Sequence, residues 1–297
     1  MNELLRTAAE SRLDYVVNGK ARNLPFMSDA EKLSLERKAE ELIERKTTAV
    51  KGSSKIKVTG IQDYPDFREV QYLLHEKWLI QNDDSFYLEE KIARRFAAVT
   101  DSEVLEDWAE SRPAEEEMFI PPDYEDNLDR KGFYYDRMAA VQYAERWWNS
   151  HNSQYKNFEV NCTNFVSQCL RSGGAQMRGY PGKGTGWWMQ NNTWSYSWAV
   201  AHSMNLFLPR SKAGLRAVKV NSAEELRPGD VICYDFQGDG RFDHTTFVVA
   251  KDKNSMPLVN AHTSNSRMRY WSYKDSTAYT PNIRYSFYRI QDDSEKS

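Results

Sequence analysis

The chain is poor in cysteine and histidine for its length. Its 297 residues include 3 Cys and 5 His. Cys162 and Cys169 fall in one expected helix, a spacing that suits neither a disulfide framework nor a structural zinc site. We therefore expect free thiols, as in a reducing compartment, and no metal or other cofactor.

The sequence also lacks excess positive charge and long apolar runs. The formal net charge is -3, and 28% of the residues are charged. No stretch of about eighteen uncharged apolar residues occurs, and the first ten residues carry acids instead of an apolar run. We expect no nucleic-acid partner, no membrane span and no secretory signal. A cytoplasmic location follows, with export by another route left open.

Residues 1–112 are expected to form an α+β domain. The Ser28-Asp29 pair is typical of a helix start, and the segments after residue 52 alternate between apolar and polar side chains. The expected helices are 3–17 and 29–48, and the expected strands of an antiparallel meander are 55–62, 67–81, 85–99 and 103–109. This element order resembles a cystatin-like or nuclear-transport-factor-like cone. We find no catalytic residues here, and we expect a role in positioning a substrate or a partner.

Residues 113–132 are acidic and contain prolines, which indicates a linker to a second domain at 133–292. Asp136 should cap the first helix of that domain, because its side chain precedes a broad apolar face. The later part reads as an antiparallel sheet with strands at 231–236, 245–250, 258–263, 267–271 and 283–290. The whole chain is thus expected to be α+β with two domains.

Cys162 lies where a helix should begin. Apolar residues recur at helical spacing after it, and Gly173-Gly174 offers a stop. Backbone N–H groups and the dipole at a helix N-terminus favour a thiolate over a thiol, so Cys162 is the candidate nucleophile. We expect it to be partly exposed. Cys169 and Cys233 are expected to be buried hydrophobes.

A nucleophilic cysteine needs a base, and the base needs a third group that fixes its tautomer. His244 opens one expected strand, and Asn260 and His262 lie on the next strand of the same expected hairpin. Asn260 and His262 share one face of that strand, so the register decides which of them reaches His244. The residues leave both alternatives open.

Two further groups of residues are expected to contact a substrate. Asn161 or Asn164 could donate to an oxyanion, beside the backbone N–H of Cys162. Trp187, Trp188 and Trp194 belong to a passage of clustered rings, most of which pack a core. One or two of them could line a cleft, because flat amphipathic rings suit sugar or peptide faces.

Four segments in order carry a resemblance to a known family. They are Asn161 to Gln168 (NCTNFVSQ), Gly229 to Ile232 (GDVI), Asp243 to Thr246 (DHTT) and Val259 to Thr263 (VNAHT). Together they resemble the putative amidase domain family, which is similar to papain-like cysteine peptidases and to amidohydrolases of bacterial cell walls. The resemblance covers about half of the chain, roughly 133–292.

The resemblance implies a papain-like domain in which a nucleophile helix packs on an antiparallel sheet. It also implies Cys162 as nucleophile, His244 as base and Asn260 as the third residue. The expected activity is cleavage of an amide bond in peptidoglycan or a related peptide. The family's members usually reach the cell wall through a signal peptide, and this chain departs from them by showing none.

Three alternatives accompany that expectation. The domain could be an inactive module that binds peptide or glycan. A cysteine-zinc amidase could use Asp243 with His244 and His262 as metal ligands. The segment from Asp235 to Asp243 resembles half of a calcium loop, but it lacks the terminal bidentate glutamate. We favour a glycine-rich turn that presents His244.

Overall fold

The computed structural model describes residues 1–19, 24–110 and 132–296, and they fall into two compact units. Unit 1 comprises Met1–Arg112 and Ser264–Tyr279, and unit 2 comprises Pro113–Thr263 and Thr280–Ser297. The expected linker, 113–132, lies outside the described residues except for Gly132.

Unit 1 begins with two helices, α1 (Asn2–Asn18) and α2 (Asp29–Glu44). The Ser28 side chain accepts a hydrogen bond from the Glu31 N–H at 3.3 Å, so the expected capping at this helix start is confirmed. Helix α1 ends at Gly19, whose φ of 60° is the left-handed conformation that glycine adopts without a Cβ clash.

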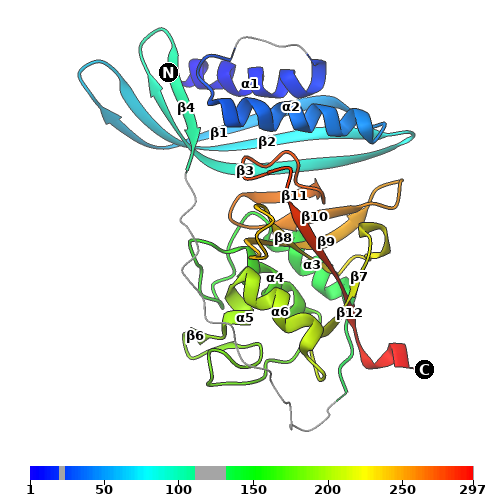
Figure 1. Ribbon diagram of the computed structural model, residues 1–297. Coiled ribbons are helices and arrows are strands. Elements are labelled where there is room, and N and C mark those ends of the chain that lie inside the picture. Colours follow the sequence, from blue (N-terminus) through cyan, green and yellow to red (C-terminus); the bar gives the residue numbers. More distant parts are fainter. Residues whose placement is uncertain (20–23, 111–131, 297) are drawn as a thin grey trace. The chain divides into compact units, whose positions relative to one another are not determined.

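The two helices cover a strongly curved antiparallel sheet (Figure 1). Its first four strands follow each other in the chain and pair as a meander. They are β1 (Thr48–Asp63), β2 (Arg68–Asn82), β3 (Ser85–Val99) and β4 (Val104–Ala109). Side chains of β2 alternate between buried and half-buried, which fits a sheet with one face under helices. The expected meander is confirmed, with β1 starting earlier than its sequence pattern indicated.

The fifth strand of unit 1 comes from much later in the chain. Strand β11 (Asn265–Tyr270) pairs antiparallel with β3, with Asn265 opposite Ile92 and Arg267 opposite Glu90. The segment 264–279 therefore groups with unit 1, although it falls inside the second domain expected from sequence. Strand pairing between distant segments leaves no local pattern, so this assignment could not be read from the chain.

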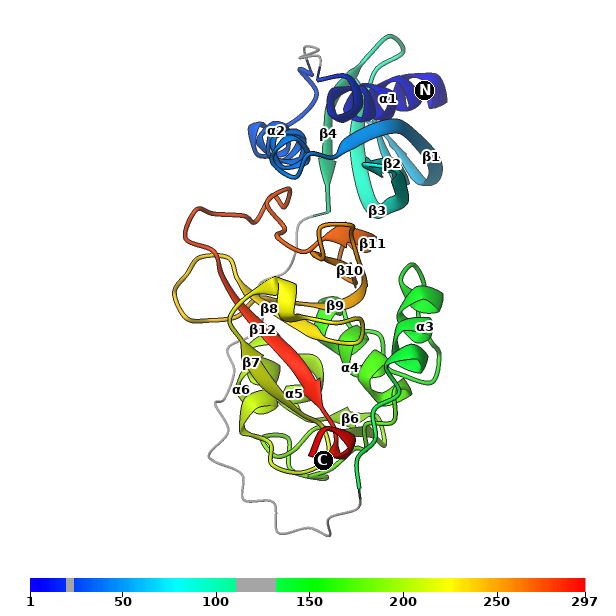
Figure 2. The ribbon, with the colours of Figure 1, turned by 90° about the vertical axis from the view of Figure 1, so that its right-hand side faces the viewer.

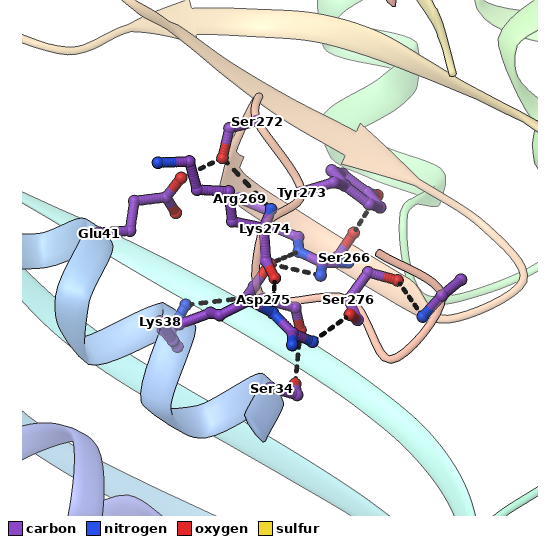
Figure 3. Close-up of polar contacts among 12 residues, drawn as sticks. Ser34, Lys38, Glu41, Ser266, Arg269, Ser272, Tyr273, Lys274, Asp275 and Ser276 are labelled. Carbon is purple, nitrogen blue, oxygen red and sulfur yellow. Dashed lines mark hydrogen bonds and ion pairs between the residues drawn. The ribbon is translucent and has the colours of Figure 1, made fainter. Parts of the chain in front are cut away.

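A buried polar network holds the loop after β11 to helix α2 (Figure 3). Asp275 accepts hydrogen bonds from the Arg269 guanidinium at 2.5 and 2.9 Å, and it also pairs with Lys38 at 3.4 Å. Lys38 in turn contacts Glu89 of β3 at 2.5 Å. The Ser34 hydroxyl donates to the Asp275 carbonyl at 2.6 Å. Paired charges of both signs thus fix this loop on the helix.

Unit 2 contains an antiparallel sheet of five strands in the order β10-β9-β8-β12-β7. The strands are β7 (Arg216–Val220), β8 (Val231–Asp235), β9 (His244–Lys251), β10 (Pro257–Ala261) and β12 (Arg284–Gln291). Strands β8, β9 and β10 are buried along nearly their whole length. Strand β7 was not predicted, because its five residues show only a short alternation.

Helices pack against this sheet, and the views in Figures 1 and 2 show them among the strands of unit 2. They are α3 (Arg137–Trp147), α4 (Cys162–Ser172) and α6 (Ala201–Arg210), and the short helix α5 (Tyr196–Ala199) packs on α4 and α6. Asp136 caps α3 by accepting from the Ala139 N–H at 2.9 Å, as expected. Short elements complete the unit: β5 (Met189–Gln190), β6 (Thr193–Trp194) and the 3-10 turns η1 (Ala223–Glu225) and η2 (Asp293–Lys296).

The described part of the chain is a mixture of helices and antiparallel sheet, in agreement with the expected α+β class. None of its helices combines the length and the apolar character that crossing a membrane would require.

Candidate active site

Cys162 is the first residue of α4, as the sequence pattern predicted. The first backbone bond of the helix runs from the Phe165 N–H to the Asn161 carbonyl at 3.0 Å, and the helix ends at Gly173. Helix geometry directs the N–H groups of the first turn outward from this end, where they favour negative charge. Cys162 therefore lies at the end of the helix where a thiolate would be favoured over a thiol.

Cys162 is more deeply buried than expected. Only 1% of its surface is exposed, and every residue from Cys162 to Leu170 is buried. The expectation of a partly exposed cysteine was wrong, because α4 is surrounded by packing on all sides instead of lying on the surface of the unit.

Helix α4 packs against strand β9, which starts at His244. The hydroxyl oxygens of Thr163 and Thr245 lie 3.0 Å apart and form a hydrogen bond. These two threonines directly follow Cys162 and His244 in the chain. The bond therefore holds the backbones of the two candidate residues close together at the junction between helix and strand.

The loop before His244 is stabilised by two aspartates. The buried Asp235 carboxylate accepts from the N–H groups of Gly238 and Gly240 at 2.7 and 2.8 Å, so it organises the glycine turn from inside. The Asp243 N–H donates to the Tyr234 carbonyl at 2.7 Å. Because Asp235 binds backbone N–H groups, these contacts support a turn that presents His244 and do not resemble a calcium loop.

His244 is 2% exposed and lies among aromatic rings. It stands opposite Tyr234 of β8, with ring centroids 5.6 Å apart, and the Phe236 ring is 6.2 Å away. The hydroxyls of Tyr234 and Thr246 lie 3.0 Å apart. Packing on this scale restricts the ring to few orientations.

Strands β9 and β10 form the expected hairpin, but in a register that differs from the one in which Asn260 would face His244. Asn260 stands opposite Phe247, three positions along β9 from His244. At about 3.3 Å per residue, that separation is roughly 10 Å along the strand. A bulge between Leu258 and Val259 shifts the pairing. The expectation that Asn260 faces His244 directly was therefore wrong in register.

The Asn260 side chain is fully buried and points to helix α3. Its amide nitrogen donates to the Glu145 carboxylate at 2.8 Å and lies 3.4 Å from the Ala144 carbonyl. These bonds join β10 to α3. The Asn260 side chain thus holds helix α3 to strand β10. Its expected role in orienting His244 stays a prediction.

His262 connects two other parts of the site. Its Nε2 lies 2.8 Å from the Trp147 carbonyl at the end of α3, and its Nδ1 lies 2.8 Å from the Asn161 side-chain nitrogen. The ring stacks on Phe165 with centroids 4.1 Å apart, and 2% of the residue is exposed. Burial lowers the pKa of His262 to about 4, so the ring is neutral at pH 7.

The Asn161 and Asn164 amides are engaged within the protein. Asn164 donates from its side-chain nitrogen to the Lys156 carbonyl at 2.9 Å and to the Asn161 side-chain oxygen at 2.8 Å, which uses both of its N–H groups. Asn161 directs one N–H to His262. Of these two candidate oxyanion donors, Asn161 therefore retains a second side-chain N–H beside the one directed to His262.

The three tryptophans expected to line a cleft differ in exposure. Trp187 and Trp188 are each 1% exposed, and their indole N–H groups donate to Ser167 and to the Gly182 and Thr185 carbonyls. Both rings therefore pack in the core of the unit. Trp194 is half-buried, and the ammonium groups of Lys156 and Lys183 lie 4.4 and 5.3 Å from its ring.

The other two cysteines are fully buried, as expected. Burial raises the pKa of the Cys169 thiol and that of the Cys233 thiol well above the ordinary value. Thiols held protonated in this way are poor nucleophiles. Within the described ranges we find no group of three or more His, Cys, Asp or Glu side chains that could hold a metal ion.

Sequence reasoning did not identify several residues that organise the site. Thr163 and Thr245 join helix to strand, Trp147 accepts from His262, and Trp198 donates to the Asn164 side-chain oxygen at 2.7 Å. The threonines directly follow Cys162 and His244 in the chain, so their position next to the candidate residues could have identified them. Trp147 acts through its carbonyl, for which no residue type is diagnostic.

Comparison with known proteins adds the family. A profile described as "putative amidase domain" matches residues 134–288. The chain is 50% identical over 302 residues to "uncharacterized protein YhbB" of Bacillus subtilis (strain 168), covering 99% of this chain and 97% of that protein. "Uncharacterized protein YjcM" of the same organism is 27% identical over 140 residues, covering 44% of this chain and 31% of that protein. No solved structure matches. The chain belongs to the putative amidase domain family.

Proposed function

We propose that unit 2 is a cysteine-dependent amidohydrolase in which Cys162 is the nucleophile and His244 is the base. The observation that carries the proposal is the junction of α4 and β9. A cysteine begins a buried helix, a histidine begins the strand packed on it, and the residues that follow them are hydrogen-bonded. Membership of an amidase family supports the same reaction class.

The reaction would proceed in two steps. In the first, the Cys162 sulfur attacks the amide carbonyl carbon while His244 takes the thiol proton and then gives it to the leaving amine. The C–N bond breaks and a thioester remains. In the second, water attacks the thioester, its proton passes to His244, and the acid and the free thiol are released. The N-terminus of α4 would stabilise the oxyanion of both steps, where each donor is typically worth about 3 kcal/mol.

The substrate class follows from the family resemblance, and the site is compatible with it. Peptidoglycan peptides and related peptides carry amide bonds in extended chains, and a half-buried ring such as Trp194 offers a flat face for them. The two lysines beside that ring would attract a carboxylate-bearing substrate. A papain-like arrangement of unit 2 is part of this proposal.

The test compares two cysteines of the same helix. Cys162→Ala should reduce hydrolysis of peptidoglycan-derived peptides to background, whereas Cys169→Ala should retain most of the activity. The second variant should lose about 1 kcal/mol of stability through a small cavity, because Cys169 is fully buried on the apolar face. Activity retained by Cys162→Ala would end the proposal, and equal loss in both variants would mean that the nucleophile is misplaced.

An inactive binding module is the second candidate, favoured by the 1% exposure of Cys162. Alkylation by iodoacetamide at mildly acidic pH separates the two functions. A thiolate at a helix start reacts selectively, so an enzyme should be labelled at Cys162 before Cys169 or Cys233. Labelling of all three thiols at the same slow rate, together with binding of muropeptides without hydrolysis, would favour the module.

A further inference from the structure

We infer that His262 is a positioning residue that fixes Asn161 and the start of α4 to the end of α3, and that it carries no proton in the reaction. The inference rests on the proposed function, because Asn161 directly precedes the proposed nucleophile. It assigns to His262 a task that differs from orienting His244.

The bonds of the His262 ring have a defined direction. The Trp147 carbonyl can only accept, so the ring must donate to it from Nε2. In a neutral imidazole the other nitrogen then accepts, and Nδ1 faces the side-chain nitrogen of Asn161, which is a donor. The Asn161 orientation is itself fixed, because its side-chain oxygen accepts from the backbone N–H of Phe158 at 3.2 Å.

The hydrogen bonds that reach Asn161 from Asn164 and Trp198 have the same donor-to-acceptor direction. Its side-chain oxygen also accepts from Asn164, and the Asn164 side-chain oxygen accepts from the Trp198 indole N–H. An indole N–H can only donate and a backbone carbonyl can only accept. The chain of bonds from Trp198 to Trp147 therefore cannot reverse. A proton added at His262 Nδ1 would oppose the N–H of Asn161.

The surroundings of the ring keep it neutral. It is stacked on Phe165 and almost fully buried, and a second histidine, His151, meets it edge-on with ring centroids 5.3 Å apart. Burial and His151 both lower the pKa of His262. A group that stays neutral through the physiological range is suited to hold a hydrogen-bonded geometry and unsuited to exchange protons at pH 7.

Two consecutive residues grip Asn161. His262 binds its side chain, and the Thr263 hydroxyl accepts from its backbone N–H at 3.1 Å. Asn161 is the N-cap of α4, but its side chain does not cap the helix. These two bonds, from His262 and Thr263 to Asn161, are here called the clamp. The clamp therefore determines where the helix begins, and with it the position of the Cys162 sulfur. Displacing a reacting atom by about 1 Å can cost on the order of 100-fold in rate.

Two substitutions separate clamping from proton transfer in the full-length protein. His262→Gln offers an oxygen to Asn161 and an N–H to Trp147 but cannot titrate. His262→Phe retains a ring against Phe165 and loses both bonds. We expect His262→Gln to keep hydrolysis and Cys162 alkylation within about fivefold, and His262→Phe to lose roughly 30- to 100-fold in kcat with a smaller change in KM. Equal loss in both variants would overturn the inference.

The ring nitrogens of the wild-type protein give a second readout that needs neither substrate nor variant. In protein labelled with ¹⁵N-histidine, His262 should show the neutral form protonated at Nε2 and should not titrate between pH 8 and about pH 5. A proton on Nδ1, or a titration midpoint near 6.5, would overturn the inference. If Cys162→Ala retained hydrolysis, the proposed function would fail. The ¹⁵N measurement would still show whether His262 is neutral and bound to Asn161 in the inferred direction.

Discussion

Two buried regions of the molecule, one in each unit, hold polar groups of different kinds. In unit 1, charged side chains meet beneath α2, where Asp275 binds Arg269 and Lys38. Around the candidate site of unit 2, the hydrogen bonds of the Asn161 and His262 side chains join neutral amides, an imidazole and carbonyls. Both regions are buried, so a difference in solvent exposure does not explain why one holds charged groups and the other neutral ones.

The difference has a physical meaning. Buried ion pairs fix a geometry, but their strong local fields would interfere with a charge that has to appear and vanish during a reaction. Neutral donors and acceptors hold a nucleophile in place without stabilising a permanent charge beside it. We therefore expect the charged network of unit 1 to serve its fold and the neutral network of unit 2 to serve the reaction.

Removal of residues 1–112 should have the largest effect. The linker expected at 113–132 would allow this deletion, but β11 pairs with β3, and buried Asp275 pairs with Lys38 of α2, which in turn contacts Glu89 of β3. The fragment 113–297 would expose that edge and those charges, so it should aggregate or be cleaved within 264–279 during limited proteolysis. Co-expression with residues 1–112 should protect the segment. A fragment that is soluble and resists cleavage alone would contradict this prediction.

Asp275→Ala should come next in size. It leaves the Arg269 guanidinium and the Lys38 ammonium buried without their shared carboxylate, which typically costs 3–5 kcal/mol. Urea denaturation followed at resolved NMR amide signals of each unit would measure the loss. The matched control is Glu44→Ala, which breaks the more exposed pair with Lys274 and should cost under about 1 kcal/mol. Equal losses would mean that burial does not decide the energy.

The two units should also respond to pH in opposite directions. In unit 1, burial and nearby Asp275 raise the pKa of Glu41 to about 7, so its contribution to stability is present below its ordinary value of 4.5 and is lost as pH rises through 7. In unit 2, the lowered pKa of His262 makes stability fall as pH drops from 6.5 toward 4.

The variant that isolates the unit 1 effect is Glu41→Gln, which keeps an acceptor for the Ser272 hydroxyl and removes the charge. Its stability should match wild type near pH 5 and exceed it at pH 8 by at most about 3 kcal/mol, since one pKa unit corresponds to about 1.4 kcal/mol. Per-unit urea denaturation at both pH values measures this gain. Parallel pH curves for the two proteins would show that Glu41 is ionised without cost.

Local chemistry explains what could be predicted from sequence. Ser28 and Asp136 cap helices through bonds to residues three positions on, and the start of α4 follows from the spacing of its apolar residues. The hairpin of β9 and β10 was likewise visible. Prediction failed where distant segments decide the outcome, as for the pairing of β11 with β3 and the burial of Cys162.

The register of the hairpin shows the same limit on a smaller scale. Alternation places Asn260 and His262 on one face of a strand, but one bulge at Leu258 and Val259 shifts every later pair. A bulge depends on backbone packing against both neighbouring strands and has no fixed residue signature in this hairpin. The identity of the candidate site residues could thus be proposed from sequence, but their mutual positions could not.

Asn260→Ala tests whether a neutral buried amide in unit 2 acts on the reaction or on the fold. If Asn260 orients His244, as the resemblance implies, turnover should fall ten- to a hundredfold with little change in stability. The observed bonds predict the reverse. Loss of the amide leaves the Glu145 carboxylate and the Ala144 carbonyl without this donor, which should cost about 1–3 kcal/mol, while kcat changes by less than about tenfold. Paired measurements of kcat and of urea stability in unit 2 decide between them. A stable variant with strongly reduced kcat would restore Asn260 to the role expected from sequence, and it would require the β10 strand to pair differently when substrate is bound.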